Sequence, residues 1–121
     1  MSQLEKLRQL PKVIVNGTET FIYFHEYAKG DGPAIELMSW DEDNQEVEPY
    51  LFATVNGDFD LQDGEVAIKN YSDNDGVLPA LIAAGIVSPV IRRQAVGGYG
   101  ASVDICKLLI EPENPDIDWE E

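Results

Sequence analysis

Residues 12–27, KVIVNGTETFIYFHEY, decide the fold class of this 121-residue chain. The pair Asn16-Gly17 is typical of a two-residue β-hairpin turn, because both central positions of that turn need positive φ. The flanking runs, 12–15 and 18–27, are rich in β-branched and aromatic residues, which favour strands. The sequence therefore predicts an antiparallel hairpin near the N-terminus.

Further strand-like segments follow, separated by turns rich in Gly, Asp and Asn. They cover residues 34–40, 50–55, 65–70, 86–96 and 102–110. Residues 72–85 have helical spacing instead, and Gly85 is placed where a C′ glycine belongs. The apolar positions of this helix are Val77, Leu78, Leu81 and Ile82, and its candidate N-cap residues are Ser72, Asp73 and Asn74. Strands, then a helix, then strands predict an α+β fold, with an antiparallel meander of about six strands and one main helix on one face.

The length and the composition indicate one domain. With 44% hydrophobic residues, a chain of this length can bury a single core. Residues 1–11 predict an N-terminal arm or short helix, residues 12–110 the domain, and residues 111–121 an acidic tail. The tail holds six acidic residues and no basic one, so we expect it to be solvated.

The charge is strongly negative and unevenly distributed. The chain has 23 acidic and 8 basic residues, a net charge of -15, and residues 26–75 hold fourteen of the acids with two of the bases. Residues 26–75 therefore have a net charge of -12. Gathered on one face, these charges would match those of about 20 Å of duplex DNA. Two explanations stay open: a surface that mimics nucleic acid and binds a basic protein, or acidity that only keeps the protein soluble. We expect no direct binding to nucleic acid.

The mimic explanation assigns partner binding to acidic residues of the strands and turns and to one tyrosine on a glycine-rich turn. They are Glu36, Asp41, Glu42, Asp43, Glu46, Glu48, Asp58, Asp60, Asp63, Glu65 and Tyr99. Several aromatic residues of the same region are expected to fill the space between sheet and helix, although any that face outward would anchor an interface. These are Tyr23, Tyr27, Trp40, Tyr50 and Phe52.

No motif predicts a reaction. His25 lies in a strand with no general-base partner supplied by the local sequence. Cys106, the single cysteine, cannot form an intrachain disulfide and is expected to be buried, although a pairing with His25 stays open. Neither acidic loop has the EF-hand spacing, and residues 97–100 match no phosphate-binding loop. We therefore expect no enzyme activity, no metal and no cofactor.

Several short stretches together are similar to one protein family. They are Glu48-Pro49-Tyr50, Thr54-Val55-Asn56, residues 64–72, Asn74-Asp75-Gly76, Ala84-Gly85-Ile86 with Pro89, Gly98-Tyr99 and residues 104–108. Over about residues 12–110 the chain resembles a family of small domains of unknown function carried on bacterial plasmids, phages and conjugative elements. The resemblance implies a mobile-element context, a compact α+β fold and no established reaction, so no catalytic residue is carried over.

Small acidic proteins of such elements often inhibit host-defence nucleases, which is an analogy and not a property of this fold. Joined to the charge, the analogy predicts an inhibitor of the anti-restriction or anti-CRISPR type that binds a basic nucleic-acid-binding protein. The alternative is a non-enzymatic accessory module whose acidity serves solubility. No apolar run reaches the about 18 residues of a membrane helix, and residues 1–6 lack signal-peptide features. We expect a cytoplasmic location in the bacterial host and no membrane partner.

Overall fold

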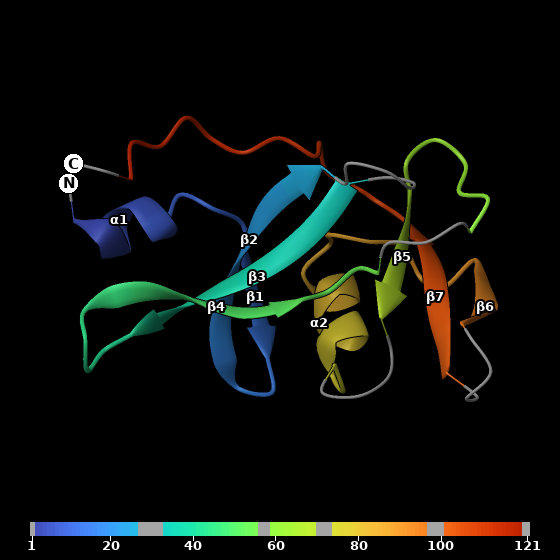
Figure 1. Ribbon diagram of the computed structural model, residues 1–121, viewed down its shortest axis with the longest axis horizontal. Coiled ribbons are helices and arrows are strands. Elements are labelled where there is room, and N and C mark those ends of the chain that lie inside the picture. The colour runs from blue at the N-terminus through green and yellow to red at the C-terminus, as the bar shows by residue number, and fades with distance from the viewer. Residues whose placement is uncertain (1, 27–32, 56–58, 70–73, 97–100, 120–121) are drawn as a thin grey trace.

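The computed structural model describes residues 2–26, 33–55, 59–69, 74–96 and 101–119. In these residues two antiparallel sheets and two short helices make up an α+β fold (Figure 1). The first sheet has the order β1-β2-β3-β4, with β1 Lys12–Val15, β2 Thr18–Glu26, β3 Pro33–Asp41 and β4 Glu46–Phe52. The second has the order β5-β7-β6, with β5 Glu65–Lys69, β6 Arg92–Val96 and β7 Ala101–Lys107; the helices are α1 Gln3–Leu7 and α2 Val77–Ala83. The α+β class is confirmed, whereas the single sheet of about six strands is wrong.

The β1–β2 hairpin is formed as predicted. Asn16 and Gly17 have φ values of 49° and 82°, and Val15 pairs with Thr18 across the turn. The two positive φ values match the twist of the flanking strands. The local turn chemistry therefore sets the register of the first two strands.

The chain passes from the first sheet to the second directly after β4. The Ala53 amide donates to the Ile35 carbonyl of β3, and the Ala53 carbonyl accepts from the Lys69 amide of β5, both at 2.8 Å. Residues 53–55 therefore join the edges of both sheets. The predicted strand 50–55 is wrong at its start, because β4 already begins at Glu46 and carries Pro49 inside it. Proline is tolerated there because β4 is the edge strand of its sheet.

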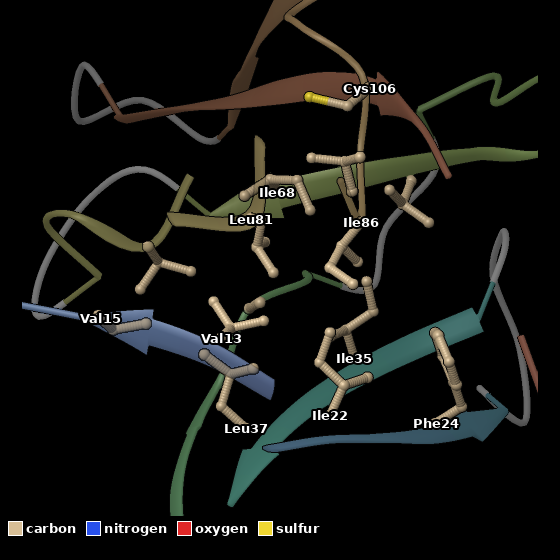
Figure 2. Packing of buried hydrophobic residues seen from close by; sticks show 14 residues of the cluster. Val13, Val15, Ile22, Phe24, Ile35, Leu37, Ile68, Leu81, Ile86 and Cys106 are labelled. Atoms are coloured by element: carbon tan, nitrogen blue, oxygen red, sulfur yellow. The ribbon is translucent and has the colours of Figure 1, made fainter. Parts of the chain in front are cut away.

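The core lies between the two sheets (Figure 2). Its fully buried members include Ile35 and Leu37 of the first sheet, Ile68 of the second and Leu81 of α2. The helix thus packs among residues of both sheets instead of covering one face of a single sheet. None of the helices in the described part of the chain is long and apolar enough to cross a membrane.

The start of α2 differs from the prediction. Its N-cap is Gly76, at φ 86°, with no side-chain cap, whereas Asn74 donates its side-chain amide to the Phe52 carbonyl. A Cβ at Gly76 would meet the Asn16 side chain at 2.5 Å, because Asn16 donates to the Asp75 carbonyl. Contact with the β1–β2 turn therefore requires glycine here. Gly85, at φ 75°, ends the helix as predicted.

The two ends of the chain meet on the outer face of the first sheet. Residues 3–7 form α1, and Leu7 packs against Phe21 there. The C-terminal segment runs back along the molecule to the N-terminus (Figure 1), and the Gln3 side chain donates to the Trp119 carbonyl at 2.8 Å. Asn114 forms two hydrogen bonds with the Phe24 main chain, at 2.8 and 2.9 Å. The expectation of a solvated tail therefore holds for the exposed acids, Glu111, Glu113, Asp116 and Asp118. It is wrong for Asn114, Ile117 and Trp119, which are partly buried.

Candidate functional site

The outer face of the first sheet carries a pocket. Strand alternation places Tyr23 and His25 of β2 on the face opposite the core. Helix α1 and the C-terminal segment cover only part of this face and leave a pocket of about 450 Å³. It is lined by Gln3, Tyr23, His25, Glu36, Met38, Glu46, Val47 and Trp119.

A histidine–carboxylate pair lies in the pocket wall. His25 Nε2 is 2.8 Å from Glu36 Oε1, and the Glu36 side chain is 16% exposed while that of His25 is 41% exposed. The centroid of the Tyr23 ring is 5.2 Å from that of the His25 imidazole, in an edge-to-face arrangement. The Phe52 ring is tilted against the same imidazole, with a centroid distance of 5.6 Å. Glu36 is the partner of His25 that the local sequence did not reveal, since it comes from the neighbouring strand β3.

The described residues of the pocket lining include no serine, threonine or cysteine that His25 would activate as a nucleophile. Cys106 is fully buried in the core between the sheets (Figure 2), whereas His25 is on the outer face. The Cys106–His25 pairing is therefore excluded. Burial, with a smaller contribution from the Asp104 charge, raises the pKa of the Cys106 thiol to about 11. The described residues contain no group of three or more His, Cys, Asp or Glu side chains able to hold a metal ion.

Residues 41–48, at the turn end of the β3–β4 hairpin, carry five of the predicted partner-binding residues. Asp41 shapes its turn: its carboxylate accepts from the Asn44 side chain at 2.7 Å and from the Asn44 and Asp43 amides, and these hydrogen bonds lower the pKa of Asp41. The other four are exposed, namely Glu42, Asp43, Glu46 and Glu48. None of the four forms an ion pair in the described part of the chain, although Arg8 lines the same hollow as Glu42 and Glu48.

The second predicted acidic group lies elsewhere. Glu65, almost fully buried, pairs with Arg92 at 2.9 Å and accepts from the Gln62 amide, and the hydrogen bond from Arg92 lowers the pKa of Glu65. Asp60 and Asp63 are exposed in the segment before β5. That segment and the β3–β4 turn lie at opposite ends of the long axis of the molecule (Figure 1). Asp58 and Tyr99 are outside the described residues.

The structure therefore divides the predicted site residues into unlike sets. It brings Glu36 and Glu46 together in the pocket, and it pairs Glu65 with Arg92. Glu42, Asp43, Glu46 and Glu48 form no ion pair within the described part of the chain. The expectation that the aromatic residues fill the core is wrong for Tyr23, Tyr50 and Phe52; Tyr50 is 38% and Phe52 46% exposed. Tyr27 is outside the described residues. Trp40 joins the cluster of Leu7, Leu10 and Phe21 on the outer face.

The pocket itself was missed, because one of its walls is Trp119. The sequence places that residue in a segment rich in acids, and only its docking beside α1 brings it to the sheet. The one available signal was the alternation of Tyr23 and His25 with Ile22 and Phe24, which predicts an aromatic face opposite an apolar one.

The fold and the site define a class: an acidic, two-sheet α+β domain with an aromatic outer face that its own termini partly cover. No protein-family model matches the chain, no curated protein matches its sequence, and no solved structure matches it.

Proposed function

We propose that the chain is a non-enzymatic binding protein whose β3–β4 hairpin binds a basic, nucleic-acid-binding protein. The observation that carries this proposal is the set of four exposed hairpin carboxylates, Glu42, Asp43, Glu46 and Glu48, without ion pairs among the described residues. The sequence contains no Lys or Arg between Lys29 and Lys69, so nothing within this stretch neutralises them. Such a group steers a cationic partner and speeds its association at low salt.

Exposed aromatic side chains near these carboxylates supply binding energy that charge alone does not. Tyr50 and Phe52 are exposed on the same edge strand as Glu46 and Glu48. Exposed charge pairs contribute little affinity each, whereas desolvated aromatic residues carry much of the binding energy of interfaces. Exposed carboxylates and exposed aromatic side chains on one edge strand therefore supply both steering and contact area for binding in a basic groove.

The family resemblance supplies the context of the proposal. In a plasmid- or phage-borne protein in bacterial cytoplasm, the basic partner is a host-defence nuclease, and the carboxylates take the place of the phosphates of its DNA or RNA. The protein then acts as a nucleic-acid mimic of the anti-restriction or anti-CRISPR type. This context rests on resemblance and electrostatics together.

One observation favours the alternative, an accessory module whose acidity serves solubility. The hairpin acids and the acids before β5 are on segments at opposite ends of the molecule, so the two groups are not adjacent (Figure 1). Acids spread over a surface keep a protein soluble without any partner. The two functions differ in whether the position of the charge matters, and this difference can be measured.

The test compares two variants of equal net charge. The hairpin variant carries Glu42→Lys, Asp43→Lys and Glu48→Lys, and it spares Asp41 because that residue holds the turn. The tail variant carries Glu111→Lys, Glu113→Lys and Asp116→Lys, all exposed. Each variant and the unchanged chain are used to capture proteins from bacterial lysate at about 0.1 M salt, where screening acts over about 10 Å.

We expect a nucleic-acid-binding protein to be retained by the unchanged chain and by the tail variant, lost from the hairpin variant and displaced by added duplex DNA. Equal loss in both variants would mean that only overall charge acts. Capture that DNA does not displace would contradict the mimic. No capture by the unchanged chain would leave solubility as the reason for the acids.

A further inference from the structure

We propose that the pocket on the outer face of the first sheet binds one arginine side chain, with the guanidinium against Glu36 and Glu46 and beside the rings of Tyr23 and Trp119. The proposal rests on the proposed function for the source of the arginine, which is the basic partner protein. The hairpin and the pocket are continuous, because Glu46 belongs to both.

The size of the pocket suits a single side chain. Its volume of about 450 Å³ lies within the range of about 300–1,000 Å³ that holds small ligands. It is open to solvent and is walled by β2, β3 and β4 on the sheet side and by Gln3 and Trp119 from the two ends of the chain. A side chain that projects from a partner on the hairpin can enter it.

The charge of the lining selects a cation. Among the described residues two carboxylates line the pocket and no Lys or Arg does, and His25 is the one basic side chain of that described lining. Glu36 is largely withdrawn from water, which strengthens its attraction for a cation. One of its oxygens already meets His25, but a carboxylate has about four acceptor positions and can receive a guanidinium as well.

The rings favour arginine over lysine. A guanidinium is planar, it stacks on aromatic faces, and its fork of donors matches a carboxylate. Tyr23 and Trp119 supply the rings, and tryptophan is the strongest partner for such a cation. The Trp119 carbonyl accepts a hydrogen bond from the Gln3 side chain. Trp119 also packs, together with Ile117, against the cluster of Leu7, Leu10 and Phe21. The docked C-terminal segment is therefore one wall of the site.

The test uses the full chain and a small probe. Acetyl-arginine amide is titrated into the ¹⁵N-labelled protein, with acetyl-lysine amide and the neutral isostere acetyl-citrulline amide as comparisons. We expect saturable shifts of the Trp119 indole and the Tyr23 amide, with a dissociation constant on the order of 1 mM for arginine. Lysine should bind about threefold more weakly and citrulline at least about tenfold more weakly. No saturable shift at the pocket residues, or equal binding of citrulline, overturns the proposal.

Matched variants locate the site. Glu36→Gln should weaken arginine binding about tenfold, since it removes the withdrawn charge, and Tyr23→Leu about threefold, since it removes a ring. Glu48→Gln removes a hairpin carboxylate that does not line the pocket and should leave binding unchanged. Amide spectra of each variant establish that it is folded. Equal weakening by Glu36→Gln and Glu48→Gln would mean diffuse attraction and would overturn the pocket.

The pocket and the proposed function fail in different ways. Arginine amide binding by a chain that captures no partner overturns the proposed function and leaves the pocket. Partner capture that survives both Glu36→Gln and Tyr23→Leu, but not the hairpin variant, overturns the pocket and leaves the proposed function.

Discussion

The two faces of the first sheet differ in chemistry although the same strands supply both. The inner face carries Ile22, Ile35 and Leu37, which are fully buried against the second sheet and α2. The outer face carries Phe21, which Leu7 and Leu10 bury, and beside it Tyr23 and His25, which the terminal segments cover only in part. Because alternate residues of a strand point to opposite faces, one segment can stabilise the fold and present a site at the same time. Substitutions on the two faces should therefore differ in kind as well as in size.

The largest effect should come from the inner face. Leu37→Ala removes a fully buried side chain and leaves a cavity, which should lower the free energy of unfolding by about 3 kcal/mol. Ile14→Ala, at a half-exposed position of β1, should change it by less than about 0.5 kcal/mol. Urea unfolding followed by circular dichroism measures both. Similar losses in the two variants would break the distinction between the faces.

Removing residues 111–121 should have an intermediate effect. The deletion takes away the two Asn114 hydrogen bonds to Phe24 and the packing of Ile117 and Trp119, so we expect a loss of about 2 kcal/mol with the two sheets still folded. Thermal unfolding measures the loss, and the amide spectrum reports the fold. An unchanged melting temperature would mean that the segment does not dock. Complete unfolding would mean that the two sheets cannot fold without it.

The comparison extends to charge, because Glu65 forms an ion pair with Arg92, whereas Glu42 forms none among the described residues. The pKa of Glu65 is held below its ordinary value of 4.5, mainly by Arg92. Its contribution to stability is therefore fully present above about pH 4.5 and is lost as the pH falls through the lowered pKa. Glu65→Gln should reduce stability at neutral pH and remove this part of the acid dependence.

Glu42→Gln is the matched control for that prediction, since the exposed Glu42 carboxylate forms no ion pair among the described residues. It should leave the pH profile of stability as it is. Urea unfolding at a series of pH values compares the two variants with the unchanged chain. Identical profiles for all three proteins would show that the Glu65–Arg92 pair contributes nothing.

The smallest effect concerns Cys106. Because burial raises the pKa of its thiol to about 11, the native protein should not react with iodoacetamide at mildly alkaline pH. Reaction should follow addition of denaturant. Mass spectrometry counts the added group, and rapid labelling of the native chain would show that the core between the sheets opens readily.

Local patterns predicted part of this molecule. The Asn16-Gly17 turn, the strand alternation around it and the end of α2 at Gly85 each depend on residues close in sequence, and all three are observed. The pattern also predicted the acidic β3–β4 hairpin, although it placed the start of β4 too late. The predicted strand 50–55 leaves Pro49 outside, and only the position of β4 at a sheet edge explains why this proline stands inside the strand.

The sequence by itself determined the net charge of -15, the strand-rich α+β class and the first hairpin. Only the tertiary structure decided that residues 53–55 join two sheets, that Glu65 meets Arg92, that Glu36 meets His25, and that Trp119 becomes a wall of a pocket. The reason is separation along the chain. A turn type or a net charge is a property of neighbouring residues or of a sum, whereas each of these contacts depends on strand register and on which distant segments pack together.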